Sequence, residues 1–524
     1  MAGKTAAGRE VQTRGRSPVD VAMGCLSDGD TKGAARALRG IGADDPRHPE
    51  VLLVQALIAT GEHRFHEAVT LAAQAKDRLK DPSMALNVLG GGLWKLGMYP
   101  EALTVLNQAL DLRPDLAAAR LNRAVVLQEM GRFEDAAADL RHLMDMSDHA
   151  VAWRQYVGTR TFGPDAPELT RLRQLLQGKR LSARDRAAYQ HCIAKIHSDL
   201  GRYDAAFAAY QAGNRLQREA NAREGHRFDR EAHLGNIRRS ARRFTPELFS
   251  GAARPEGQGL SVLTICGLPR SGKTVLQQHL TRHPVMRSLG ERNVTQALAR
   301  RLGLKGASVL LSRTRALTSE QLEGLREQLD HSWERGPEQA SVGVTTSPSG
   351  LHHVPFLALV SQASRFIWVQ RRLDNTALSI YLKWFERHEA YACDIDDIAL
   401  RCVAHEALMA HWQSVVPAEI LVVRYEDLVE NPAAVLGPLL ESLDVDPHPP
   451  CLGEDLPALS PLQVGPGQSL ESPTRITADF DRILQHYRQP LERVRDALDR
   501  AAARLVKSVP ELTDQVPAPA RWRG

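Results

Sequence analysis

The first half of the sequence repeats itself every 34 residues. Four positions at this spacing carry threonine or an aromatic residue, and an alanine follows each of them three positions later. These residues are Thr31, Phe65, Tyr99 and Phe133, with Ala34, Ala68, Ala102 and Ala136. A fixed period of this length indicates one helix–turn–helix unit per repeat, in which a small alanine lets two helices approach closely. The period therefore predicts an all-α solenoid of stacked helix pairs.

The clearest copies of the repeat are Gly97-Met-Tyr-Pro-Glu-Ala-Leu103 and Gly131-Arg-Phe-Glu-Asp-Ala-Ala137, and Gly201–Ala206 carries a further copy. Pro114 follows the helical stretch Leu106–Arg113 and is expected to end a helix there. Period and pattern resemble the tetratricopeptide repeat. The resemblance implies a curved solenoid with a concave docking face, which we expect to recruit a protein or peptide acceptor or another partner.

Beyond the repeats, short apolar runs alternate with helical stretches. The runs Leu260–Cys266, Phe366–Gln370 and Ile420–Arg424 predict buried strands. Strands that alternate with helices indicate βαβ units around a central parallel sheet. The predicted fold class is thus an all-α repeat solenoid followed by an α/β domain of the P-loop-like kind.

Composition shifts divide the chain into five predicted segments. They are a disordered basic tail (1–16), the helical repeat domain (17–235), a Gly/Pro-containing linker (236–259), the α/β domain (260–510) and a C-terminal tail (511–524).

Charge and cysteine usage exclude several classes of protein. The 67 basic and 62 acidic side chains give a formal net charge of +5, far from the concentrated basic surface of a nucleic-acid-binding protein. No apolar run is long enough to span a membrane, and the N-terminus lacks the apolar segment of a signal peptide. The six cysteines are scattered without a CxxC pair, which favours a reducing cytoplasm and predicts no metal site.

The loop Gly267-Leu-Pro-Arg-Ser-Gly-Lys-Thr274 lies between a predicted strand and the predicted helix Val275–Leu280. A glycine-containing turn at the start of a helix presents backbone N–H groups to an anion. Taken alone, the loop satisfies the Walker A pattern of a nucleotide triphosphatase or kinase. Such enzymes need an acidic residue after another strand to hold magnesium, whereas the predicted strands end in Gln370-Arg371 and Arg424. An ATP-dependent enzyme is thus the weaker alternative.

The same loop resembles the 5′-phosphosulfate loop of sulfotransferases that use 3′-phosphoadenosine-5′-phosphosulfate (PAPS). His283-Pro284 and Gly290-Glu291 follow at the family's distances, and Arg371 and Ser379 resemble the pair that grips the 3′-phosphate. Arg424-Tyr-Glu-Asp-Leu428 is similar to a third family pattern. The resemblance covers about residues 258–440, and the fusion to repeats is similar to bacterial tetratricopeptide-repeat sulfotransferases, with the tyrosylprotein type nearest in pattern.

The resemblance implies transfer of a sulfuryl group from PAPS to an acceptor hydroxyl, with protein tyrosine as one candidate. It implies Arg270 as the catalytic cation at the bridging oxygen and Glu291 as the general base. It implies a cofactor site without metal, formed by Pro269, Arg270, Ser271, Gly272, Lys273, Thr274, Arg371 and Ser379.

Three departures from the family pattern leave a non-catalytic repeat scaffold as a further alternative. Lys273 replaces the usual threonine, and Thr345-Thr-Ser-Pro348 lacks the lysine that relatives carry before this proline. Residues 460–490 lack the family's Trp-Arg-Arg-Tyr stretch. One hypothesis is that Lys273 supplies the missing cation.

Overall fold

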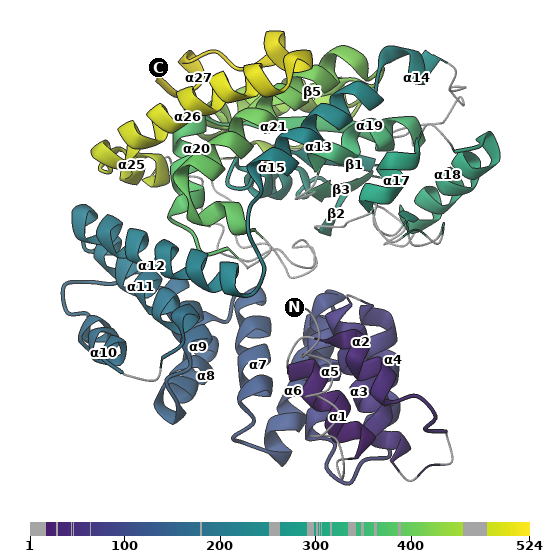
Figure 1. Cartoon of the computed structure of the whole chain (residues 1–524), viewed down its shortest axis with the longest axis vertical. Helices are drawn as coiled ribbons and strands as arrows, with labels where there is room; N and C mark the ends of the chain where they lie inside the picture. The colour runs from purple at the N-terminus through teal and green to yellow at the C-terminus, as the bar shows by residue number, and fades with distance from the viewer. Residues whose placement is uncertain are drawn as a thin grey trace, which may run out of the picture. The chain divides into compact units, whose positions relative to one another are not determined.

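The structure is a computed structural model that describes residues 17–523 apart from short internal gaps. The gaps are residues 28–29, 43–44, 46, 63, 179–180, 251–261, 291–297, 300–301, 303, 305–306, 315–316, 334–341, 347–349, 361–363, 386–388 and 454–478. The chain divides into two compact units, Met1–Ala152 and Trp153–Gly524. Each unit is described by itself (Figure 1).

The first unit is built from helices that pair with their neighbours along the chain. They are α1 (Pro18–Ser27), α2 (Thr31–Ala37), α3 (His48–Gly61), α4 (Phe65–Lys76), α5 (Ser83–Lys95), α6 (Tyr99–Leu112), α7 (Ala117–Glu129) and α8 (Phe133–Met146). The four threonine or aromatic positions of the 34-residue period are the first residues of α2, α4, α6 and α8. The four alanines are at most 1% exposed. The predicted helical repeat is confirmed.

Two turns inside these helix pairs contain a glycine in the left-handed conformation. Gly97 and Gly131 each lie two residues before the second helix of a pair, with φ of 79° and 74°. Glycine adopts this left-handed conformation without the clash that a Cβ atom would cause. The helix α6 ends at Leu112, directly before the turn that contains Pro114, as its sequence predicts.

The second unit begins with more helices. The helix α9 (Ala150–Gly158) spans the division between the units, and the next ones are α10 (Pro167–Leu176), α11 (Ala183–Asp199), α12 (Tyr203–Arg223), α13 (Arg230–Arg243) and α14 (Pro246–Ser250). Tyr203 starts α12 and Ala206 is fully buried, so the further repeat copy also forms a helix pair, α11 with α12. These helices belong to the compact unit that contains the sheet. The domain boundary at 236–259 stays a prediction.

The sheet of the second unit has five parallel strands in the order β2-β3-β1-β4-β5. They are β1 (Val262–Cys266), β2 (Met286–Gly290), β3 (Val342–Thr346), β4 (Ser364–Gln370) and β5 (Ile420–Arg424). The predicted parallel sheet and three of its strands, β1, β4 and β5, are confirmed, whereas β2 and β3 were not predicted.

Helices connect the strands, cover both faces of the sheet and form a further layer outside it. They are α15 (Lys273–Leu280), α17 (Ala307–Arg313), α18 (Ser319–Trp333), α19 (Gly350–Val360), α20 (Leu373–Tyr381), η2 (Ala390–Cys393), α21 (Ile395–Val415), α22 (Tyr425–Glu430), α23 (Pro432–Ser442), α24 (Pro449–Leu452), α25 (Asp479–Gln485), α26 (Arg488–Ser508), η3 (Pro510–Gln515) and α27 (Ala520–Arg523). No helix in the described ranges is both long enough and apolar enough to cross a membrane.

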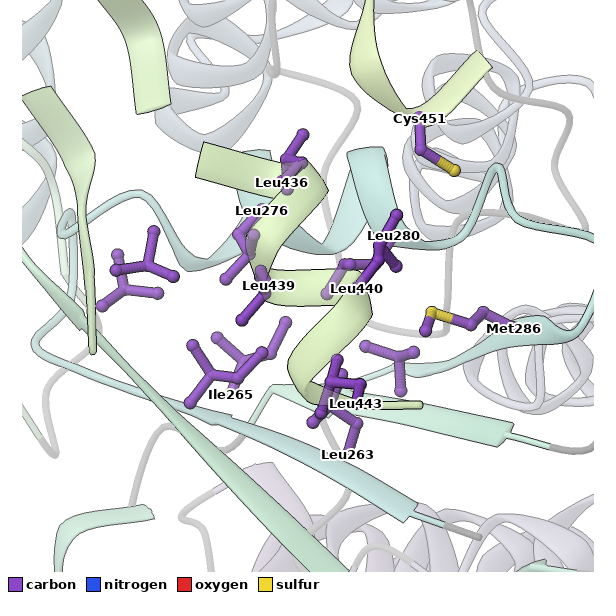
Figure 2. Close-up of a cluster of buried hydrophobic side chains, with 14 of the residues drawn as sticks. Leu263, Ile265, Leu276, Leu280, Met286, Leu436, Leu439, Leu440, Leu443 and Cys451 are labelled. Atoms are coloured by element: carbon purple, nitrogen blue, oxygen red, sulfur yellow. The ribbon is translucent and has the colours of Figure 1, made fainter. Parts of the chain in front are cut away.

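One face of the sheet packs against α15 and α23. Figure 2 shows this core, in which Leu263 and Ile265 of β1 meet the leucines of both helices. The other residues of β1 are also buried, because α19 lies on the opposite face. Burial on both faces is the usual condition of a parallel strand.

A second helical layer lies outside α19 and α20. The helix α21 packs on both of them, and α26 runs along α20 and α21 (Figure 1). Asp394 caps α21 by accepting hydrogen bonds from the backbone N–H groups of Asp396 and Asp397. The segment predicted as a C-terminal tail forms η3 and α27, and Trp522 is buried there.

Candidate functional site

The strand order places a topological switch point at the carboxyl ends of β1 and β4. After β1 the chain proceeds to β2, on one side of the sheet, and after β4 it proceeds to β5, on the other side. Ligands of open parallel sheets bind where the connections diverge in this way. The Gly267–Thr274 loop follows β1 and Arg371 follows the adjacent parallel strand β4, so the topology brings the two predicted subsites to the same edge of the sheet.

The loop has an unusual backbone conformation. Gly267, Arg270 and Gly272 have φ of 153°, 67° and 98°. A Cβ atom on Gly272 would lie 2.2 Å from Cδ2 of Tyr425, so only glycine fits there. Arg270 is not a glycine, and its left-handed conformation costs about 1–2 kcal/mol. Strain of this kind occurs mainly where a backbone is shaped for a ligand.

Polar groups of the loop are turned toward its interior. The Ser271 side chain is 2% exposed, and its Oγ has no hydrogen-bond partner among the described residues. A buried hydroxyl without a partner is rare in proteins, which indicates that a further group binds there. Gly272 caps the following helix without a side-chain hydrogen bond. Pro269 and Thr274 are half-buried beside it.

The Lys273 side chain stabilises the conformation of the loop. Its Nζ donates hydrogen bonds to the carbonyl oxygens of Gly267 and Leu268, at 2.9 and 2.8 Å, and the side chain is buried. Burial also raises the pKa of the nearby Cys266 thiol to about 12, so this cysteine is no nucleophile at neutral pH. Whether Lys273 replaces the family's missing lysine stays a hypothesis.

Arg371 and Ser379 both contact the loop through Arg270. Arg371 Nη1 donates a hydrogen bond to the carbonyl oxygen of Arg270 at 2.7 Å, and Arg270 Nε donates one to Ser379 Oγ at 3.0 Å. Residues that lie about a hundred positions apart in the sequence therefore form one cluster. The cluster offers two guanidinium groups, which suit phosphate geometry well.

Tyr425 and Glu426, at the start of α22 (Tyr425–Glu430) directly after β5, support this cluster. The Tyr425 ring lies against Gly272, and the guanidinium carbon of Arg371 is 4.7 Å from the ring centroid. Glu426 Oε1 accepts a hydrogen bond from the backbone N–H of Arg372 at 2.8 Å. The Arg424–Leu428 pattern thus holds the loop and the Arg371 turn together, which the sequence did not reveal.

Other positions singled out in the sequence are not among the residues of this cluster that the structure describes. Glu291, Ser347 and Pro348 fall outside the described residues, whereas Thr345 and Thr346 are buried in β3. Within the described part of the chain, no cluster of His, Cys, Asp or Glu is arranged to hold a metal ion.

Family models match two segments of the chain. Residues 263–450 match the sulfotransferase family, and residues 93–131 match the TPR repeat. The second unit thus contains a domain that matches the sulfotransferase family, and the helical repeats before it include a match to the TPR repeat.

Individual relatives are distant. An uncharacterized protein from Aquifex aeolicus (strain VF5) is 24% identical over 358 residues, which are 65% of this chain and 45% of that protein. The chain thus spans under half the length of this relative. Among solved structures, the sulfotransferase domain of the Synechococcus PCC 7002 olefin synthase shares 18% identity at a TM-score of 0.30, covering 45% of this chain and 97% of that domain. A mutant O-GlcNAc transferase from Thermobaculum terrenum shares 15% identity at a TM-score of 0.25, covering 92% and 99% of the two chains.

Proposed function

We propose that the protein transfers a sulfuryl group from PAPS to an acceptor hydroxyl. The observation that carries this proposal is the cluster in which Arg270 joins the loop after β1 to Arg371 and Ser379 after β4. A loop shaped for one phosphate, with a second cationic subsite beside it, suits a nucleotide that carries phosphate at both its 5′ and 3′ positions.

The residues of the site fit PAPS. The inward hydroxyl of Ser271, Gly272 and the start of α15 would hold the 5′-phosphate, together with Thr274. Arg371 and Ser379 would hold the 3′-phosphate. Bound PAPS supplies the sulfuryl group, whose bond to the 5′-phosphate oxygen breaks as the bond to the acceptor oxygen forms.

Arg270 has the position that this chemistry needs. It is exposed, belongs to the loop and bonds Ser379, which supports a place between the two proposed subsites. A guanidinium at this point stabilises the negative charge that develops on the leaving oxygen. The acceptor hydroxyl must lose its proton to a base, and we assign that role to Glu291.

The acceptor and its recruitment are part of the same proposal. We assign the TPR repeats the role of holding a protein or peptide acceptor, for which tyrosine is the candidate residue. The six cysteines are all free and five are buried, which supports action in the reducing cytoplasm.

An ATP-dependent enzyme is the second candidate, favoured by the pair Lys273-Thr274 in the loop. The strands beside β1 argue against it, because β3 ends at Thr346 and β4 at Gln370, without an acidic residue for magnesium. A scaffold without turnover would have the same binding residues, so only an activity measurement distinguishes it from an active sulfotransferase.

The test compares adenosine 3′,5′-bisphosphate with ATP and magnesium by thermal shift. We expect stabilisation by the bisphosphate and a loss of about tenfold or more in its affinity for Arg371→Ala, since charged hydrogen bonds contribute about 1.5–3 kcal/mol. Arg365→Ala is the matched control, because Arg365 lies near the start of β4, at the opposite end of the strand that Arg371 follows, and bonds Asp444. Preferential stabilisation by ATP and magnesium would refute the proposal.

Turnover is measured with labelled PAPS over a panel of tyrosine peptides and other hydroxyl acceptors. We expect Arg270→Ala to abolish the signal. A protein that binds the bisphosphate but transfers no label to any acceptor would support the scaffold instead.

A further inference from the structure

We propose that Arg495, on α26 and outside the family-matched segment, positions the 3′-phosphate subsite through the buried carboxylate of Asp374. The proposal rests on the proposed function, because it assigns a positioning residue to the same nucleotide site. Arg495 itself is not placed in contact with the nucleotide.

Asp374 is a carboxylate held between two arginines. It is 0% exposed, and its Oδ2 accepts a hydrogen bond from Arg495 Nε at 2.9 Å and forms an ion pair with Arg495 Nη2, also at 2.9 Å. Arg372 approaches from the other side, with Nη2 at 2.9 Å from Oδ2 and Nε at 3.2 Å from Oδ1. The backbone N–H of Asn375 also donates to Oδ1 at 2.9 Å. A buried carboxylate is tolerated only when it is paired and hydrogen-bonded as fully as this one.

Asp374 lies in the segment that carries both residues assigned to the 3′-phosphate, Arg371 and Ser379. Arg371 lies three residues before Asp374, and α20, which begins at Leu373, carries Ser379 near its end. The backbone of Arg372 is fixed to Glu426 of α22, while its side chain is fixed to Asp374. Arg495 thus attaches the turn after β4 and the start of α20 to the outer helix α26.

Removal of Arg495 has a predictable structural effect. Asp374 would lose a hydrogen bond and an ion pair in a site that water does not reach, and would keep Arg372 and the Asn375 N–H as partners. We expect the turn or the Arg372 side chain to shift to satisfy the carboxylate more fully, and either movement displaces Arg371. A displaced Arg371 guanidinium would bind the 3′-phosphate less tightly, since a bidentate contact depends on orientation.

The charge balance changes in the same direction. Arg495 also pairs with Glu492, so the guanidinium groups of Arg371, Arg372 and Arg495 face the carboxylates of Asp374, Glu426 and Glu492. Removal of Arg495 takes one positive charge from this cluster, so the subsite attracts a phosphate dianion less strongly. The loop that grips the 5′-phosphate is supported by Tyr425 instead. The inference therefore predicts a selective loss at the 3′-phosphate.

The test measures dissociation constants of adenosine 3′,5′-bisphosphate and adenosine 5′-phosphate by calorimetry on the full chain. For Arg495→Met we expect the bisphosphate to bind about tenfold or more weaker, which is about 1.4 kcal/mol, and the monophosphate to change by less than about twofold. Arg495→Lys keeps the charge without the planar fork, so its loss should be selective too but smaller, about threefold.

The matched control is Arg500→Met, which removes an arginine–aspartate pair from the same helix. Arg500 pairs with Asp396 on α21 at an exposed position, so both affinities should stay unchanged. Equal weakening of both nucleotides by Arg495→Met, or no weakening, would overturn the proposal. If Arg495→Met fails to fold by circular dichroism, Arg495→Lys decides, and unchanged selectivity in that variant overturns it. A wild-type protein that binds both nucleotides equally refutes the proposed function instead.

Discussion

The repeat helices of the first unit and the loop after β1 both bring backbone segments close together, but by different means. In the repeats, Ala102 and Ala136 keep helical geometry, and a small side chain alone lets the helices approach. In the loop, Gly272 has a left-handed backbone and lies against the ring of Tyr425.

The two regions differ in how strongly each depends on a single close contact. The repeat has several equivalent close contacts, so each one contributes part of the stability of the helix stack. The loop depends on the one contact between Gly272 and Tyr425, which also shapes the proposed anion site. Substitutions at the two kinds of position should therefore affect different measurements.

The largest effect is expected for Gly272→Ala. The added methyl group would meet Tyr425 Cδ2 at 2.2 Å, and the left-handed φ of 98° disfavours alanine by about 1–2 kcal/mol. We expect the affinity for adenosine 3′,5′-bisphosphate to fall about 100-fold, which is about 2.7 kcal/mol, as measured by calorimetry.

The control for this substitution is Gly437→Ala in α23, where no atom lies within 4 Å of the added methyl group. We expect unchanged nucleotide affinity and a small gain in stability, about 0.5–1 kcal/mol, from the higher helix propensity of alanine. If Gly272→Ala bound the bisphosphate as tightly as Gly437→Ala does, the loop would not depend on this contact.

A smaller effect, on a different measurement, is expected for Ala136→Leu. The larger side chain has no room between the paired helices, and such overpacking costs about 1–3 kcal/mol. Chemical denaturation should show a weakened first unit, while nucleotide affinity stays unchanged. Ala138→Leu is the matched control, since Ala138 is exposed on the same helix and should change stability by less than about 0.5 kcal/mol. A loss of nucleotide affinity in Ala136→Leu would contradict the separation of the two roles.

The same contrast explains what the sequence could predict of the fold. The helix pairs that contain Tyr99 and Phe133 were predictable because the same residue pattern recurs every 34 positions. Strand β3 was missed because Val342-Gly-Val-Thr-Thr346 is short and contains a glycine, which disfavours strands. That glycine makes room for its neighbour, since a Cβ on Gly343 would lie 2.5 Å from Leu289 Cδ1 in β2.

The site was predictable only in its parts. The loop with Arg371 and Ser379 was found through family resemblance, because each carries a local pattern. The contacts that join them, from Tyr425 to Gly272 and from Arg495 to Asp374, link residues more than a hundred positions apart. No local pattern records such pairs, so they required the three-dimensional structure.

The smallest effect is expected at Tyr425, the other partner in the loop contact. Tyr425→Leu removes the ring face beneath the Arg371 guanidinium, a cation–π contact of about 0.5–2 kcal/mol. We expect bisphosphate affinity to fall by about three- to tenfold by calorimetry, whereas Tyr425→Phe keeps the ring and should stay within about twofold. Equal losses in both variants would assign the effect to the hydroxyl instead.

Combining this change with Gly272→Ala separates the two causes of the glycine requirement. Leucine lacks the ring that the methyl group of alanine would meet, so the steric part of the penalty should shrink in the double variant, while the cost of the left-handed backbone persists. A double-mutant cycle on bisphosphate affinity measures this coupling directly. A penalty for Gly272→Ala that is the same in both backgrounds would show that backbone conformation, not contact with Tyr425, makes glycine necessary. The loop would then resemble the turns at Gly97 and Gly131, where positive φ is the reason for glycine.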